Sequence, residues 1–344
     1  MTVCGQWRQT VAGHSAWVER LWKAAFVHRW TLSLSLTVGM MRAMQGPHGW
    51  RQKCVARGHI DQNWRTGRHR WQPPVISDII GLSGDLVVVS LDRDVQVLHV
   101  SDGRRIGPPI RGHHCAFLGS TAGVVVLARP YFGPRTSIDI WRFADGQLLR
   151  TIDCDRRVHI NVVVEPLEPA VAWTSSAVGV TQFDLERGVE CCRFGDDWSR
   201  LLAVDGHTLL EGAVSEQCVR VWDTRTARPT YRLNHDTGTL SKISVDGNAV
   251  MIWGKWRRGV CELWDLRRPR TEIVSFEEVS WAAVAGGRAV VYSYLNGMQI
   301  AHPPGATTIS VPVAKELERI YLHEAMMDSE RVVGSFGVFD FAFV

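Results

Sequence analysis

The chain has 344 residues, of which 45% are hydrophobic and 22% charged, so it can bury a large core as an ordinary globular protein does. Its longest apolar stretch, residues 31–41, is too short for a membrane span, which needs about 20 residues, and we expect no membrane partner. The net charge of +4 is uneven, because residues 1–71 carry 11 Lys and Arg against two acids, Glu19 and Asp61. These basic residues are scattered and form no run of five, so we do not expect nucleic-acid binding.

The first 71 residues hold seven of the 15 tryptophans and show no clear alternation of apolar and polar residues. Trp17, Leu21 and Trp22 follow the three- and four-residue spacing of an amphipathic helix, and Ser15 is a suitable N-cap. The pattern predicts helices within residues 1–30, followed by a linker over residues 31–67.

Short motifs in this front part follow a recognisable order. They are Val3-Cys4, Trp7-Arg8, Trp17 and Leu21-Trp22, and later Trp50-Arg51 and the N-W-R-T-G segment at residues 63–67. The first group resembles the second half of an F-box, and the second group resembles the linker that F-box/WD-repeat proteins place before their propeller. The resemblance implies partial F-box helices over residues 1–30 and a Skp-type adaptor as partner. The adaptor-facing residues would be Val3, Cys4, Trp7, Arg8, Trp17, Leu21 and Trp22.

The first half of an F-box, with its Leu-Pro, has no counterpart before Met1. We therefore expect that the box is either truncated in this sequence or lost from the protein. An alternative role for the front tryptophans is to pack a helical cap against the rest of the chain.

From residue 72 onward one unit recurs: a short apolar strand, a tight polar turn, an alternating strand, and a turn rich in Asp, Gly, Arg and Pro. The alternating strands are expected at residues 95–100, 138–143, 178–185, 219–223, 261–266, 298–301 and 339–344. Their equivalent positions are Leu98, Trp141, Phe183, Trp222, Trp264, Ile300 and Phe341, at intervals of 43, 42, 39, 42, 36 and 41 residues. A period near 40 with several strands per unit is typical of propeller blades. We therefore expect an all-β, seven-bladed β-propeller over residues 68–344.

Two units contain a Trp-Asp dipeptide, Trp222-Asp223 and Trp264-Asp265, and Gly112-His113 lies between the first two units. These features resemble WD repeats. In that family His, Ser, Asp and Trp form a hydrogen-bonded set within a blade, but no unit here has all four. We therefore expect the propeller to be stabilised mostly by apolar packing between blades.

The last unit, about residues 319–344, supplies three strands and stops. An open blade would leave an exposed strand edge. The segment at residues 68–72 is placed to supply the missing outer strand, which would join the two ends of the chain. Deleting the last eight residues should then unfold the ring.

The sequence contains no G-x-S-x-G, H-E-x-x-H or P-loop motif, and we expect neither enzymatic activity nor a cofactor. His113-His114 lacks a third ligand at a suitable spacing, so no metal site is expected. Asp196-Asp197 and Glu277-Glu278 are typical of solvated turns. The eight cysteines show no C-x-x-C spacing and are interpreted as reduced, mostly buried thiols of a cytoplasmic or nuclear protein.

A partner would bind the narrow face, which the turns between second and third strands and the inter-blade loops would form. These turns contain Arg93, Arg135, Lys255, Arg257 and Arg258. Arginine can hold phosphate or carboxylate with two hydrogen bonds, which favours a phosphorylated or acidic protein substrate. The family resemblance implies the substrate-recognition subunit of an SCF-type ubiquitin ligase. The alternatives are a WD-repeat scaffold without a ligase role and, third, an enzyme built on a propeller.

Overall fold

The computed structural model consists almost wholly of antiparallel β-structure. It describes residues 58–60, 62–63, 65–66, 70–72 and 78–340, the last range with gaps at 84–85, 92–93, 101, 112–114, 118–122, 129–135, 155–161, 165–170, 177–178, 195–198, 214–216, 255–258, 270–271, 286–287, 294–296, 303–306, 312–324, 328–330 and 335–336. The short pieces between 58 and 66 are helical.

The described strands form seven four-stranded antiparallel sheets. The first three are β2 (Asp78–Ser83), β3 (Leu86–Leu91), β4 (Asp94–His99) and β5 (Arg105–Arg111); β6 (Cys115–Phe117), β7 (Val124–Ala128), β8 (Thr136–Arg142) and β9 (Gln147–Cys154); and β10 (Val162–Val164), β11 (Val171–Ser176), β12 (Gly179–Asp184) and β13 (Val189–Phe194). The next three are β14 (Ser199–Asp205), β15 (Thr208–Ala213), β16 (Cys218–Asp223) and β17 (Arg228–Asn234); β18 (Leu240–Asp246), β19 (Ala249–Gly254), β20 (Cys261–Asp265) and β21 (Glu272–Phe276); and β22 (Val279–Ala285), β23 (Arg288–Ser293), β24 (Gly297–His302) and β25 (Thr307–Val311). The last contains β26 (Ala325–Met327), β27 (Arg331–Gly334), β28 (Gly337–Asp340) and β1 (Arg70–Gln72).

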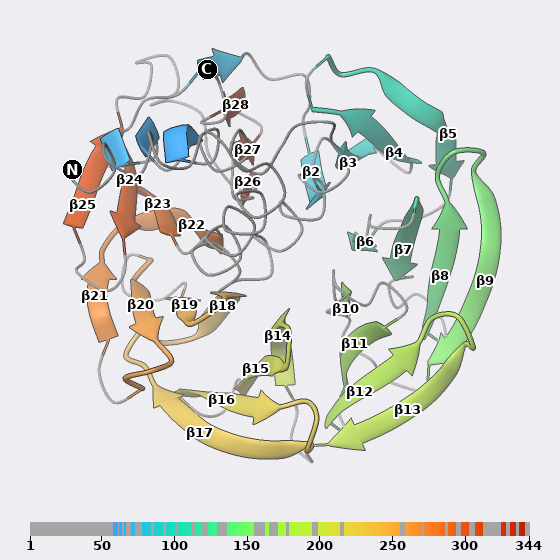
Figure 1. Ribbon diagram of the computed structural model, residues 1–344. Coiled ribbons are helices and arrows are strands. Elements are labelled where there is room, and N and C mark those ends of the chain that lie inside the picture. Colours follow the sequence, from blue (N-terminus) through green and yellow to red (C-terminus); the bar gives the residue numbers. More distant parts are fainter. Residues whose placement is uncertain are drawn as a thin grey trace, which may run out of the picture.

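The sheets follow one another around a ring, with the first strand of each sheet toward the middle and the last at the outside (Figure 1). Each innermost strand contacts the innermost strand of the next sheet, from β2 through β6, β10, β14, β18 and β22 to β26, and β26 contacts β2 again. This arrangement is compatible with a β-propeller, as the repeat predicts.

Ring closure follows the predicted route. β1 pairs antiparallel with β28, and Arg70, Trp71 and Gln72 lie opposite Asp340, Phe339 and Val338. The last sheet therefore has the order β1-β28-β27-β26, in which three strands come from the end of the chain and the outer one from its front. The prediction that the segment at residues 68–72 completes the last sheet is confirmed.

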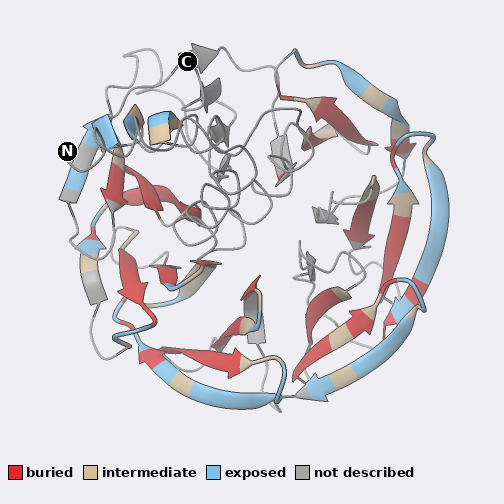
Figure 2. Cartoon of the chain, in the orientation of Figure 1, coloured by how far each residue is buried: buried red, intermediate tan, exposed pale blue. Residues whose placement is uncertain are grey.

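Burial explains why the strands differ in composition. The second strands, such as β3 (LVVVSL) and β23 (RAVVYS), are apolar along most of their length because both of their faces pack against neighbouring sheets. The outer strands β9 and β17 are mostly exposed and carry Arg, Gln, Asp and Thr (Figure 2). Strand character thus changes from apolar to polar as the chain moves outward through a sheet.

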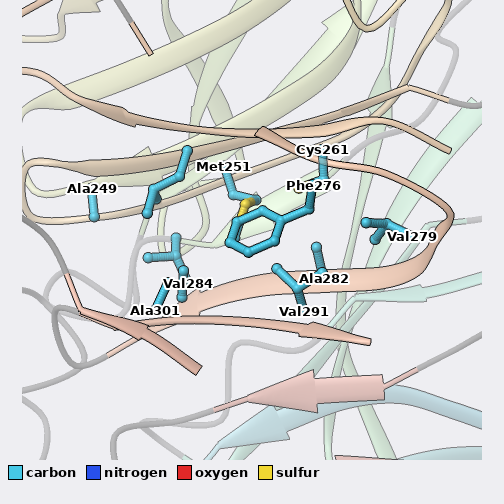
Figure 3. Close-up of a cluster of buried hydrophobic side chains, with 11 residues drawn as sticks. Ala249, Met251, Cys261, Phe276, Val279, Ala282, Val284, Val291 and Ala301 are labelled. Atoms are coloured by element: carbon cyan, nitrogen blue, oxygen red, sulfur yellow. The ribbon is translucent and has the colours of Figure 1, made fainter. Parts of the chain in front are cut away.

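The core lies between sheets. Each larger cluster of buried side chains takes residues from two consecutive sheets, as in the cluster that joins β18–β21 to β22–β25 (Figure 3). There Met251, Cys261 and Phe276 of one sheet pack against Ala282 and Val291 of the next. Similar clusters join the other consecutive pairs from β2–β5 to β18–β21. The expected apolar packing between neighbouring sheets is therefore present.

The predicted alternating strands coincide with the third strands β4, β8, β12, β16, β20 and β24, and β28 begins two residues before its predicted start. One equivalent position was wrong. Trp222 lies opposite Leu209, which is the second residue of the second strand of its sheet, β15. In the sheet β22–β25, the second residue of the second strand is Ala289, and the residue opposite it is Ala301, not the predicted Ile300. Ala301 also belongs to the inter-sheet cluster, whereas Ile300 does not. Neighbouring residues of a strand point to opposite faces. The prediction chose the larger apolar residue, Ile300, and therefore placed the equivalent position on the wrong face of β24.

In the last sheet the same register assigns the position to Phe339, which lies opposite Val332 in β27. The predicted residue, Phe341, lies outside the described residues.

Candidate functional site

All the residues predicted to face an adaptor or a substrate lie outside the part of the chain that the structure describes. These are Val3, Cys4, Trp7, Arg8, Trp17, Leu21 and Trp22 at the front, and Arg93, Arg135, Lys255, Arg257 and Arg258 in the segments between second and third strands. The strands that flank these segments belong to two neighbouring sheets, β2–β5 and β6–β9, and to the sheet β18–β21, which two further sheets separate from β6–β9 around the ring.

Buried glutamates hold the two tryptophans of the Trp-Asp dipeptides. The indole N–H of Trp222 donates to Oε2 of Glu211 at 2.8 Å, and that of Trp264 donates to Oε2 of Glu262 at 3.1 Å. The other carboxylate oxygen of Glu262 accepts the backbone N–H of Asp236 at 3.0 Å. Glu262 therefore connects its sheet to the segment that enters the sheet from β17. The WD-repeat pattern did not predict these pairs, because their acceptors are glutamates and not the His, Ser or Asp of that pattern.

A buried histidine lies in the same connecting segment. His235 is 5% exposed, and its Nδ1 is 2.9 Å from Oγ1 of Thr237, which is fully buried. Burial lowers the pKa of His235 below its ordinary value, against a smaller opposing effect of Asp236. In the sequence, His235 lies five residues before the first strand of its sheet, β18. It could have been recognised there as the inter-blade histidine of a WD repeat, but it follows Asn234 and not the usual glycine.

The aspartates of the two dipeptides have a different role. Asp223 accepts hydrogen bonds from Nε and Nη2 of Arg225 at 3.0 and 2.7 Å, and Asp265 binds Arg267 in the same two-pronged way. The hydrogen bonds from the Arg225 side chain lower the pKa of Asp223 to about 2. Each pair lies where the third strand turns into the fourth. Since successive strands are antiparallel, these turns lie at the opposite end of the third strand from the predicted substrate-binding turns.

Three large apolar side chains of the described chain are exposed, and they lie in the outer strands of consecutive sheets. They are Leu148 and Leu149 in β9 and Val189 in β13, with exposures of 38%, 45% and 49%. The side chain of Arg150 lies against Gly188, so β9 reaches the turn that precedes Val189. Scattered apolar residues are common on protein surfaces, and this group alone does not define a site.

Of the five cysteines whose burial the structure describes, Cys154, Cys218 and Cys261 are buried, Cys192 is partly buried and Cys191 is exposed, and all five are free thiols. In the described part of the chain, no three His, Cys, Asp or Glu side chains are grouped so that they could hold a metal ion. None of its helical segments has the length and apolar character of a membrane span.

Comparison with known proteins supports the fold alone. The crystal structure of the computationally designed protein Ika8 is similar, with a TM-score of 0.51 and 13% sequence identity over 78% of this chain and 99% of that one. No family model matches the sequence. No curated protein matches it either.

Proposed function

We propose that the chain is a seven-bladed WD-repeat propeller that serves as the substrate-recognition subunit of an SCF-type cullin-RING ubiquitin ligase. The observation that carries the proposal is the ring of seven four-stranded sheets, closed by β1, which begins three residues after the end of the N-W-R-T-G segment. The motifs at residues 3–22 and 50–67, which resemble the F-box/WD-repeat family, support the ligase role.

The protein would make no bonds itself in this role. Its front helices would face a Skp-type adaptor through the residues named above, and the ring would hold a substrate. Holding both at once raises the effective concentration of the substrate near the ubiquitin-charged enzyme. A ring whose core lies between consecutive sheets is suited to presenting loops in fixed positions.

Adaptor binding tests the ligase role. The purified 344-residue chain is mixed with a purified Skp-type adaptor, beside the variant Leu21→Ala/Trp22→Ala and, where the gene encodes one, a form extended upstream. We expect the unaltered chain or its extended form to retain the adaptor and the variant to lose it. If neither form binds while circular dichroism reports a folded β-protein, the ligase role is wrong and a WD-repeat scaffold becomes the better hypothesis.

Substrate binding is tested separately through the predicted narrow face. Charge reversal by Arg257→Glu/Arg258→Glu should weaken capture of an acidic or phosphorylated partner without lowering the melting temperature. The matched control Arg104→Glu/Arg105→Glu alters two exposed arginines beside the β4–β5 turn, at the other end of the strands. Unchanged capture by the first variant would contradict the assignment of this face.

A further inference from the structure

We infer that the outer edge of β9 is a docking site for residues 31–40 of the same chain, which add to it as a fifth strand of the β6–β9 sheet. Two independent observations carry the inference. One is an exposed, partly apolar strand edge on the ring, and the other is a segment of the front part that alternates between apolar and polar residues. The inference concerns how the front part is attached to the ring, and it does not depend on the ligase role.

The edge of β9 is long and open. β9 is the last strand in the order β6-β7-β8-β9, so one of its edges has no partner strand in the described part of the chain. With eight residues it is the longest outer strand, and all of them except Ile152 and Cys154 are exposed (Figure 2). Its pairing with β8 is regular from Arg150 to Cys154. Such an edge presents unpaired backbone N–H and C=O groups and can take a further strand.

Two other long outer strands carry prolines, and β9 does not. β5 contains Pro108 and Pro109, and β17 contains Pro229. Proline lacks the N–H that an added strand would bind, and it commonly protects edge strands for that reason. β13 also lacks proline but is two residues shorter than β9. The edge of β9 is therefore the longest one on the ring that proline does not block.

β9 also carries two of the three large apolar side chains that are exposed in the described chain, Leu148 and Leu149. Leu148 lies opposite Trp141 in β8, so both side chains project from the same face of the sheet. Trp141 packs against the apolar cluster between the β2–β5 and β6–β9 sheets. An added strand with one apolar face would continue that cluster outward over Leu148.

Residues 31–40 have the pattern that such an edge requires. They read T-L-S-L-S-L-T-V-G-M, in which Leu32, Leu34, Leu36 and Val38 alternate with serine and threonine, and no charged residue interrupts them. This strict period of two is an exception within the front part, and it predicts a strand with one apolar and one polar face. A single strand of this kind is stabilised only when it pairs with a sheet and buries its apolar face. Ten residues match the length of β9.

The chain before the ring is long enough for the segment to reach β9. Residues 41–57 connect it to the helical pieces between 58 and 66, and 17 extended residues span at most about 60 Å. A compact chain of 344 residues has a radius of gyration of about 20 Å and hence a diameter of about 50 Å. The covalent connection gives the segment a higher effective concentration at β9 than the same segment of a second copy has at low protein concentration.

A photo-crosslinker on β9 of the 344-residue chain tests the inference. Benzoylphenylalanine replaces Leu149, and in a control variant it replaces Arg232, an exposed residue of the outer strand β17. The proteins are irradiated at low concentration, monomers are separated from dimers by denaturing gel electrophoresis, and each is digested with trypsin. The variant at Leu149 should link to the tryptic peptide of residues 30–42 within the monomer, and the control should not.

A proline substitution tests the pairing itself. Leu34→Pro removes a backbone N–H from the segment, so it should abolish the link and accelerate hydrogen exchange of the β9 amides about tenfold. Ala43→Pro, which lies in the predicted linker outside the alternating segment, should change neither. The amides of β17 should exchange at the same rate in the unaltered chain and in both proline variants.

Four results would overturn the inference. They are a link found only in dimers, which would assign the edge to a second copy; no link from position 149 to residues 30–42; equal linking from position 232; and unchanged exchange of β9 after Leu34→Pro. Adaptor binding is measured separately with Leu21→Ala/Trp22→Ala, so loss of the ligase role would leave these results unaffected.

Discussion

The indole N–H of Trp222 donates a hydrogen bond of 2.8 Å to Oε2 of Glu211, and both side chains are buried. The bond crosses from the third strand of its sheet to the second, so it fixes the tryptophan that packs against Trp173, Val180 and Val204. The buried carboxylate of Glu211 thus fixes the tryptophan by a hydrogen bond, whereas the WD-repeat pattern uses other polar groups for this purpose.

Replacing Trp222 with Phe should therefore destabilise the protein. Phe183 occupies the equivalent position of the β10–β13 sheet, so a phenyl ring suits this site in shape but lacks the N–H. Removing one partner of a buried hydrogen bond costs about 1–3 kcal/mol. We expect a loss of that size in the free energy of unfolding, measured by chemical denaturation.

A double-mutant cycle attributes this loss to the bond. Glu211→Met removes both acceptor oxygens and keeps the length of the side chain, so the bond to Trp222 is absent from either single variant. Combining the two should give a coupling energy of about 0.5–3 kcal/mol, as expected for residues in direct contact. Fully additive effects would show that the Trp222–Glu211 bond does not contribute to stability.

Stability should also fall in mild acid because of His235. Burial lowers the pKa of this side chain in the folded protein, so the unfolded chain takes up the proton first as the pH drops below about 6.5. The contribution of His235 is present above that pH and is lost as the pH falls toward the folded pKa. In melting temperatures recorded between pH 8 and pH 5, His235→Asn should reduce the fall, and an unchanged fall would contradict the role of this buried histidine.

The thiols should differ sharply in reactivity. Burial raises the pKa of Cys154 to about 12 and that of Cys261 well above its ordinary value, so both remain protonated and inaccessible in the folded protein. Cys191 is exposed. Alkylation with iodoacetamide at pH 8, followed by peptide mass spectrometry, should modify Cys191 in the native protein and the two buried thiols only after unfolding. Equal rates at Cys191 and Cys261 would contradict the burial of β20.

Several features of the fold followed from the sequence because they depend on periodicity. The 40-residue period located the third strands, and the missing fourth strand of the last unit identified the segment containing Arg70–Gln72 as its partner. The register of the strands was harder to predict. Ile300 and Ala301 are adjacent in sequence, and only the pairing with Ala289 decides which of them is equivalent to Trp222. Apolar character alone does not distinguish the two faces of a strand that is buried on both.

The polar contacts could not be predicted, because they join residues with no fixed separation in sequence. Trp222 finds Glu211 on the neighbouring strand, whereas Trp264 finds Glu262 two residues before it on its own strand. Tyr231 in β17 donates to the backbone carbonyl of Leu266, which follows β20 of the next sheet. Such partners depend on where strands meet, and the repeat unit does not determine that for any single side chain.

A designed disulfide tests ring closure, the central claim, most directly. Trp71 and Phe339 are direct partners in antiparallel strands, where Cα atoms lie about 4.5–5.5 Å apart, within the range that a disulfide can span. The control pair is Trp71→Cys/Val338→Cys, since adjacent residues of β28 point to opposite faces. Under mild oxidation of the native protein, Trp71→Cys/Phe339→Cys should yield the crosslinked peptide by mass spectrometry and raise the melting temperature, while the control should do neither. Failure of the first pair to crosslink, or equal crosslinking of both, would contradict closure of the ring by β1 and β28.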